Sequence, residues 1–108
     1  MSGRLPADLI VAAMRRRVEG AGGMATILAR GDAQAGGILV VAVDRGGPPR
    51  IWERGVGPDG RTMLIESTPK DEPEEYCRRR RARDPDLWVV ELDVAAAERF
   101  AAETMLDD

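Results

Sequence analysis

The chain has 108 residues, 44% of them hydrophobic and 32% charged, and its formal net charge at pH 7 is −3. This length suits one domain spanning residues 1–108, and the composition is typical of a globular protein, which excludes a disordered chain. No apolar run approaches the roughly 18 to 20 residues of a membrane helix, and the lack of a basic-then-apolar leader indicates a cytoplasmic protein without membrane contact.

The first predicted element is an amphipathic helix over residues 6–19. Pro6 suits the first helical turn, and Asp8 lies where a carboxylate is favoured by the positive end of the helix dipole. Apolar side chains recur at three- and four-residue spacing and form one stripe: Leu9, Ile10, Ala13, Met14 and Val18. Glycines at positions 20, 22 and 23 end the helix.

Four strands are predicted next, because short apolar runs alternate with turns rich in glycine and proline. They cover Met24–Arg30, Ile38–Val43, Arg50–Gly55 and Arg61–Ser67. The second is apolar on both faces, which indicates a central strand covered on both sides. The loop at residues 31–37 has a length common in hairpins, so the first and second strands are expected to pair.

A second helix is predicted over residues 72–83. Asp71 and Glu74 have the spacing of a capping box at its start. The helix is expected to end before Pro85, because the residue that precedes a proline avoids helical backbone angles.

A fifth strand, Leu87–Leu92, follows the proline turn. Alternation places Trp88, Val90 and Leu92 on one face and Leu87, Val89 and Glu91 on the other. Asp93 is expected to cap a last helix at residues 94–105. Its predicted inward side chains are Ala97, Phe100, Ala101 and Met105. Together these elements predict an α+β fold: a twisted antiparallel sheet of about five strands, made of a four-strand meander plus the C-terminal strand, packed with two or three helices.

Charge is unevenly distributed along the chain. Residues 1–83 carry a net charge of +4 and residues 84–108 a net charge of −7. The acidic segment would fold back on the basic body or leave two faces of opposite sign. Lys70 is the one lysine, and every other cationic side chain is arginine. This reflects either a coding bias or selection for planar, bidentate recognition of anions.

The basic run at residues 78–83 is the first candidate binding site. Arginines on one helix can neutralise RNA phosphates or the carboxylates of a protein partner. The alternative is a solvated helix face that pairs its own charges, because glutamates at positions 74 and 75 precede arginines at 78 and 79 by four residues. The candidate partner-binding residues of this run are Arg78, Arg79, Arg81 and Arg83.

Three further residues are candidates for the same site. Arg15 and Arg16 would extend the basic surface if the first and second helices lay side by side, and otherwise form an ordinary solvated face. Trp52 would anchor a partner if its strand lay at a sheet edge, and otherwise packs against the core.

Catalytic groups are sparse. The chain has no histidine, so imidazole is excluded as a general base and as a metal ligand. The lone Cys77 cannot form an internal disulfide and is expected to be a small packing residue beside Tyr76 and Arg80, with a nucleophile as the alternative. No acidic pair has a spacing typical of acid–base or metal chemistry. We therefore predict no catalytic residue, no cofactor and no metal, and we favour a protein that is not an enzyme.

Several segments together resemble a family of small bacterial proteins known only as a domain of unknown function. They are Met14-Arg15-Arg16, the stretch Ala25–Arg30, Gly31-Asp32 with Ala35-Gly36, Ile38-Leu39-Val40 and, most clearly, Asp84-Pro85-Asp86-Leu87-Trp88-Val89-Val90-Glu91. They span most of residues 9–93. The resemblance implies one small fold and brings no established activity and no catalytic residue.

The sequence therefore favours a non-catalytic cytoplasmic accessory or interaction protein that binds a macromolecule, expected to be a protein, through the second helix and the adjacent sheet edge. The first alternative is an RNA- or ribosome-associated protein that uses both basic clusters. The second is a small enzyme that acts through Cys77 or acidic residues. A homo-oligomer is a further expectation, formed by an exposed strand edge or by the acidic C-terminal end of one chain on the basic helix of another.

Overall fold

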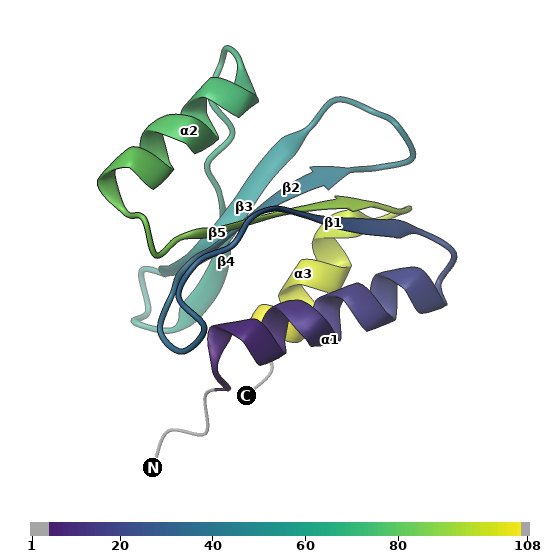
Figure 1. Cartoon of the computed structure of the whole chain (residues 1–108), viewed down its shortest axis with the longest axis horizontal. Helices are drawn as coiled ribbons and strands as arrows, with labels where there is room; N and C mark the ends of the chain where they lie inside the picture. Colours follow the sequence, from purple (N-terminus) through teal and green to yellow (C-terminus); the bar gives the residue numbers. More distant parts are fainter. Residues whose placement is uncertain (1–4, 107–108) are drawn as a thin grey trace.

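The structure is a computed structural model and describes residues 5–106. Its elements in chain order are α1 (Ala7–Gly20), β1 (Met24–Ala29), β2 (Ile38–Val43), β3 (Arg50–Val56), β4 (Thr62–Glu66), α2 (Pro73–Arg83), β5 (Trp88–Asp93) and α3 (Ala97–Met105) (Figure 1). The predicted α+β fold class is confirmed, because five strands form one mixed, mostly antiparallel sheet that packs with three helices. Within residues 5–106, no helix is both long enough and apolar enough to cross a membrane.

The strand order is β1-β5-β2-β3-β4, so the predicted meander is correct for β2, β3 and β4 and wrong for β1. The C-terminal strand β5 lies between β1 and β2, antiparallel to β1 and parallel to β2. The physical reason is that β5 is apolar on both faces: Val89 is 3% exposed and Val90 0% exposed. A strand of this kind is stable in the interior of a sheet, where both faces are covered.

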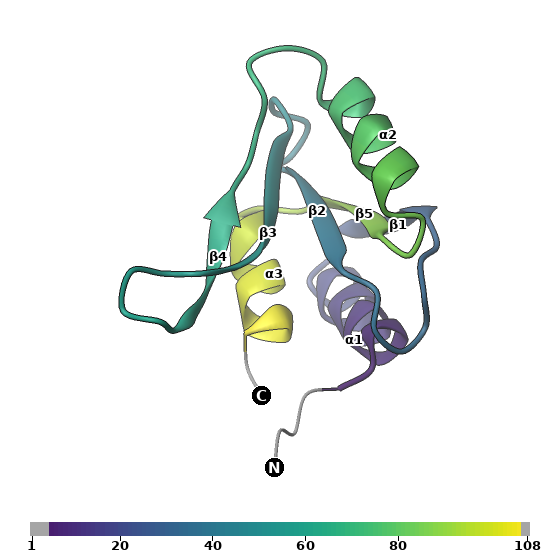
Figure 2. The ribbon, with the colours of Figure 1, turned by 90° about the vertical axis from the view of Figure 1, so that its left-hand side faces the viewer.

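One face of the sheet is covered by α1 and α3 together (Figure 2). The larger core cluster lies there, and it joins the buried stripe of α1 and that of α3 to Trp88, Val90 and Leu92 of β5. The predicted inward stripe of the last helix is confirmed, with Ala97, Ala101 and Met105 buried and Phe100 packed against the same cluster.

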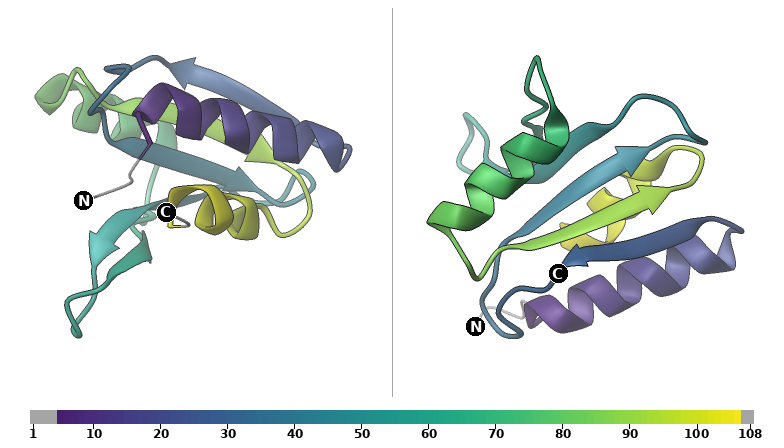
Figure 3. Two further views of the ribbon diagram at one scale, coloured as in Figure 1. Left: turned by 90° about the horizontal axis from the view of Figure 1, so that it is seen from below. Right: turned by 45° about the horizontal axis from the view of Figure 1, so that its top comes forward.

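The opposite face is covered only in part, by α2 (Figure 3). Its smaller cluster consists of Leu39, Val41, Ile51, Leu87 and Val89, with Tyr76 and Cys77 of α2 packed against it. The predicted division of the β5 side chains between two faces is thereby confirmed. No residue of α2 is fully buried, so apolar burial contributes little to holding this helix and polar contacts must contribute the rest.

Two predicted helix caps are wrong. Glu72 precedes α2 in a left-handed conformation with φ 43°, and no side-chain hydrogen bond caps the helix, so Asp71 and Glu74 do not form a capping box. Asp93 belongs to β5 and does not cap the last helix, which begins only at Ala97. The N–H of Ala96, the residue before this helix, donates to the carboxylate of Asp44 at 3.2 Å.

Candidate functional site

Two of the sequence motifs meet in space, although more than fifty residues separate them. The Asp32 N–H donates to the Asp86 carbonyl at 2.9 Å, and the Trp88 indole N–H donates to the Asp32 carbonyl at 2.8 Å. A Cβ atom on Gly31 or on Gly36 would stand 2.0 or 2.3 Å from the Asp86 oxygen. The loop at residues 31–37 and the proline turn therefore form a tight joint that only glycine permits at these two positions.

Arg81 closes the same joint from α2. Its guanidinium donates to the carbonyls of Leu87 at 3.0 Å, Arg30 at 3.1 Å and Pro85 at 2.8 Å. Carbonyls at the ends of elements lack partners in the ladder or helix, and one planar guanidinium satisfies three of them at once. Arg81 was predicted to bind a partner; the structure gives it a structural role within the chain.

The next arginine along α2 is held by the sheet. Arg80 makes a bidentate pair with Glu53 of β3, with both N···O distances at 2.8 Å, and donates to the Tyr76 hydroxyl at 2.7 Å. The predicted proximity of Tyr76 and Arg80 is confirmed. The hydrogen bonds from Arg80 lower the pKa of Glu53, although burial acts in the opposite direction. The same pair raises the pKa of Arg80 above its ordinary value, so the two charges stabilise each other.

The remaining arginines of α2 face water. Arg78, Arg79 and Arg83 are exposed, and Arg78 forms an ion pair with Glu75 of the preceding turn. Among residues 5–106, no hydrogen bond or ion pair engages the guanidinium of Arg79 or of Arg83. The basic helix is therefore divided: two inner arginines hold it in place, and three outer ones face solvent.

A groove of about 770 Å³ lies between α2 and the uncovered part of the sheet. Its apolar wall includes Val41, Val43 and Val89 on the strands and Leu28 near the end of β1. Its charged groups are Arg78 and Arg81 together with Glu72, Glu74 and Glu91. An apolar surface with charges of both signs at its border is typical of a site for an amphipathic segment.

Cys77 also lines this groove. Burial raises the pKa of its thiol, and the nearby Arg80 opposes this effect more weakly. A nucleophilic cysteine needs a lowered pKa, so the environment favours the packing role over the nucleophile. Within residues 5–106, no group of three or more cysteine, aspartate or glutamate side chains is arranged to hold a metal ion.

The other predicted site residues lie elsewhere. Arg15 and Arg16 are exposed on α1, and α1 covers the sheet face opposite to α2 (Figure 2). Trp52 lies on β3, between β2 and β4, so its strand is not an edge. Its ring packs partly against the larger core cluster, and the guanidinium of Arg50 stands 5.0 Å from its centroid. Arg15 and Arg16 were to extend the basic surface only if α1 and α2 lay side by side, and Trp52 was to anchor a partner only if its strand lay at an edge. Neither condition is met.

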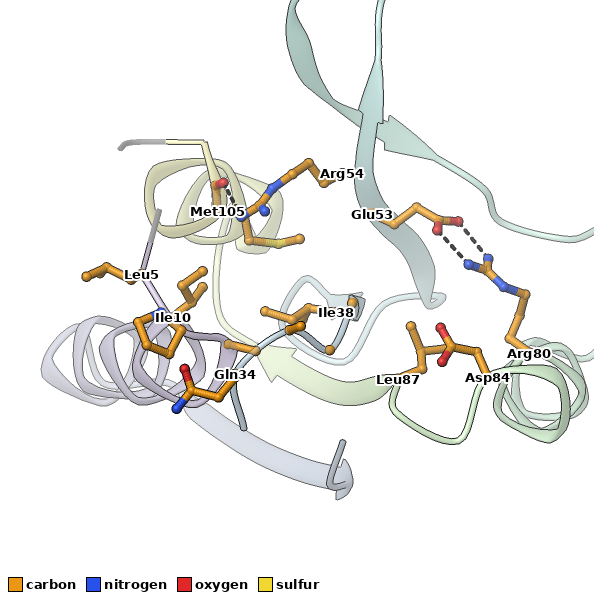
Figure 4. A pocket seen from close by; sticks show the side chains of 15 residues that line it. Leu5, Ile10, Gln34, Ile38, Glu53, Arg54, Arg80, Asp84, Leu87 and Met105 are labelled. Carbon is orange, nitrogen blue, oxygen red and sulfur yellow. Dashed lines mark hydrogen bonds and ion pairs between the residues drawn. The ribbon is translucent and has the colours of Figure 1, made fainter. Parts of the chain in front are cut away.

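A second cavity, of about 540 Å³, has the Glu53–Arg80 pair on one of its walls (Figure 4). The beginning of α1 contributes Ile10, and Gln34 comes from the loop that follows β1. On another wall Arg54 donates to the Met105 carbonyl at the end of α3 at 2.6 Å, where a cation complements the negative end of the helix dipole. The polar side chains on its walls come from four segments: the loop after β1, β3, α2 and the turn after α2. The bonds of Arg54 and Glu53 join β3 to α3 and to α2.

A family model matches residues 5–102, and it is described as "Protein of unknown function (DUF1491)". The chain belongs to this family. The resemblance that the sequence motifs indicated is thereby confirmed. Two of the motifs that carry it, Gly31-Asp32 with Ala35-Gly36 and Asp84 to Glu91, form the glycine joint and the strand β5, so in this family member they have a structural role.

Solved structures that are similar to this chain include two from Caulobacter crescentus and one from A. tumefaciens. A crystal structure of a DUF1491 family protein from Caulobacter crescentus CB15 is 37% identical, with a TM-score of 0.78, over 90% of this chain and 94% of that one. An NMR structure of a DUF1491 family protein from the same organism is 38% identical, with a TM-score of 0.74, over 89% and 91%. The solution structure of protein Atu0922 from A. tumefaciens is 28% identical, with a TM-score of 0.69, over 95% and 92%. No curated protein matches the chain.

Because of the Glu53–Arg80 pair, we expect the stability of α2 to depend on pH. Because the pKa of Glu53 lies below its ordinary value of 4.5, its stabilising contribution is fully present above pH 4.5 and is lost as the pH falls through the lowered value. We expect amide hydrogen exchange in α2 to accelerate below pH 4.5 before exchange in α1 does. The Glu53→Gln variant should show fast α2 exchange at neutral pH and a weaker change on acidification. Equal protection of both helices down to global unfolding would contradict this expectation.

Proposed function

We propose that this protein is a non-catalytic, cytoplasmic interaction protein that binds an amphipathic helical segment of a protein partner in the groove beside α2. The observation that carries the proposal is the groove itself: about 770 Å³ between an arginine helix and an apolar, uncovered part of the sheet. The segment would lie beside α2 and cover this part of the sheet, as α1 and α3 together cover the opposite face.

The chemistry of the groove specifies the segment. Its apolar side chains would meet Val43 and Val89, and an acidic side chain would meet Arg78 at the border. The Arg78 side chain is 70% exposed and its present partner is Glu75 of the same helix. An exposed pair of this kind contributes little, so exchanging one carboxylate for another has a small cost. Apolar burial would supply affinity, and the charge would supply orientation.

The RNA alternative is supported less well by the geometry. Arg15 and Arg16 lie on the face opposite to the exposed arginines of α2, so one RNA segment cannot lie flat on both clusters. The nearest aromatic ring, Tyr76, is half-buried and bonded to Arg80, which leaves no stacking platform beside the basic helix. A salt series with generic RNA tests this alternative, because phosphate contacts give binding that weakens steeply with salt.

Photocrosslinking in native cells tests the groove with a matched pair of positions. Leu28 lines the groove and is 53% exposed; Leu9 lies on α1 and is 51% exposed. We expect a crosslinking amino acid at position 28 to give a discrete protein adduct that the same amino acid at position 9 does not give. Adding Arg78→Glu should lower the yield about tenfold, the effect of roughly 1.4 kcal/mol, whereas adding Arg99→Glu on α3 should leave it unchanged.

The outcomes separate the candidate functions. The same adducts from both positions, or none from position 28, would refute the groove as the binding site. A nuclease-sensitive adduct from position 28 would replace the protein partner with a nucleic acid. An adduct that survives Arg78→Glu undiminished would exclude the acidic contact and leave the apolar one.

A further inference from the structure

The outer edge of the sheet at β4 differs from the opposite edge at β1. The ladder between β3 and β4 runs in regular register through all five residues of β4. The ladder between β1 and β5 has a bulge between Ile27 and Ala29, and a bulge of this kind blocks pairing with a further strand. Within residues 5–106, β4 has β3 as its one neighbour, and its other side is open (Figure 2).

The side chains of β4 do not protect this edge. Its sequence, Thr62-Met63-Leu64-Ile65-Glu66, contains no lysine and no proline, the residues that usually prevent edge pairing. Glu66 is the one charged residue of β4, and its side chain points back over the sheet, because it accepts two hydrogen bonds from Arg50 of β3, at 3.0 and 2.8 Å. These bonds lower the pKa of Glu66 to about 2, so the pair persists at neutral pH.

Large apolar side chains lie exposed on the β3–β4 hairpin, which projects from the body of the molecule (Figure 3). Val56 is 72% exposed, Met63 42% and Ile65 37%. Ile65 lies flat over Gly55, where a Cβ would stand 2.1 Å from its Cδ1 atom. Met63 and Ile65 therefore give one face of the hairpin an apolar surface that continues to the open edge, and Val56, which is paired with Thr62, lies exposed on the other face.

Backbone hydrogen bonds at both ends of the β3–β4 ladder show which opposed residues are hydrogen-bonded to each other. Gly57 N–H donates to the Arg61 carbonyl at 2.8 Å, and Ser67 N–H donates to the Ile51 carbonyl at 2.8 Å. Hydrogen-bonded and non-bonded pairs alternate along an antiparallel ladder. The bonded pairs at the two ends of the ladder therefore imply the same alternation of bonded and non-bonded pairs along the whole of β4.

In this pattern Met63 and Ile65 bond to β3, whereas Thr62, Leu64 and Glu66 direct their N–H and C=O groups to the open side. An added antiparallel strand that presents N–H and C=O groups at the same spacing would form hydrogen bonds with all of these outward groups. A second copy of β4, related by a two-fold axis through Leu64, has that spacing by symmetry.

We propose that this protein forms a homodimer by antiparallel pairing of β4 with β4 about Leu64. In this register Leu64 faces its own copy, Thr62 faces Glu66, and Met63 faces Ile65, so apolar meets apolar and no like charges oppose each other. A two-fold axis through Glu66 would set two carboxylates opposite each other. An axis through Thr62 would run the strand into the Gly57–Gly60 turn. Of the three registers centred on an outward-facing residue, the Leu64 register is the one that the sequence accommodates.

The dimer makes one continuous sheet through both copies. Paired residues point to the same side of a sheet, so α2 and its groove would lie on the same side in both copies. A partner with two suitable segments would then bind with an effective concentration that one copy does not provide. The dimer itself does not depend on the groove, because β1 and β4 are opposite edges of the sheet.

A proline at position 62 separates the dimer contact from the fold. The outward N–H of Thr62 makes no bond to β3, and proline is tolerated at the first residue of an edge strand. In sedimentation equilibrium we expect the wild type to dimerise between micromolar and millimolar concentrations, because the interface is small. Thr62→Pro should raise the dissociation constant roughly tenfold or more, since symmetry removes two hydrogen bonds. Thr62→Val, which keeps the N–H, should dimerise like the wild type.

A charge exchange provides the second measurement. Met63→Lys with Ile65→Lys sets like charges across the two-fold axis, as does Met63→Glu with Ile65→Glu, so each variant alone should be monomeric. A mixture of the two variants should recover the dimer. A wild type that stays monomeric into the millimolar range would overturn the proposal. So would equal dimerisation of Thr62→Pro and Thr62→Val, or a mixture of the charge variants that remains monomeric.

Discussion

Replacing Gly31 with alanine is expected to destabilise the protein by about 3 kcal/mol and to lower Tm by about 10 to 20 °C. The added Cβ would stand 2.0 Å from the Asp86 carbonyl oxygen and 2.6 Å from Cδ1 of Trp88. Neither neighbour can move away easily, because one is backbone and the other is 1% exposed. The loop must therefore shift, and the bonds that Asp32 makes to Asp86 and Trp88 lengthen with it.

Gly20 supplies the matched control. A Cβ at this last residue of α1 meets nothing within 4 Å, so Gly20→Ala should leave the free energy of unfolding unchanged or raise it by up to about 1 kcal/mol. Chemical denaturation of both variants measures the difference. A Gly31→Ala protein as stable as the parent would show that the joint between the loop and the proline turn is loosely packed.

The position of β5 shows how local and non-local signals compete in a sequence. The loop at residues 31–37 has a hairpin length, and this local signal favoured pairing of β1 with β2. The signal against it was present in Trp88-Val89-Val90, an uninterrupted apolar run that no edge position would cover on both faces. The burial of β5 outweighed the short connection. The loop instead contributes two backbone carbonyls, of Ala33 and Gln34, to the first N–H groups of α1.

The candidate site was predictable only in part, for a different reason. Helical spacing correctly separates the outer arginines of α2 from Tyr76 and Cys77, which face the sheet. It does not reveal that Glu53, on a strand of the meander, is the partner of Arg80. That pairing depends on how α2 crosses the sheet, and α2 has no buried apolar stripe from which to infer its orientation. The groove is the space left by the same crossing, so no residue pattern indicated it.

Arg81 and Arg79 offer a comparison between two arginines of one helix, one bonded and one free in residues 5–106. Arg81→Met removes a donor group that engages three backbone carbonyls. We expect a loss of about 2 kcal/mol in the free energy of unfolding, because hydrogen bonds from a charged donor contribute about 1.5 to 3 kcal/mol and two of these are partly hydrated. Arg79→Met should change stability by less than about 0.5 kcal/mol.

The same pair of variants assigns roles within the basic run. Arg81→Lys should recover little of the stability, since an ammonium group cannot present the planar fork that reaches several carbonyls. Amide exchange should show that α2 loses protection in Arg81→Met and keeps it in Arg79→Met. Equal stability of the two methionine variants would return Arg81 to the set of surface arginines. If the two methionine variants differ in stability by the expected amount, loss of partner binding in an Arg81 variant would reflect a displaced helix α2. Direct contact between this basic run and a partner can then be tested only at Arg78, Arg79 and Arg83.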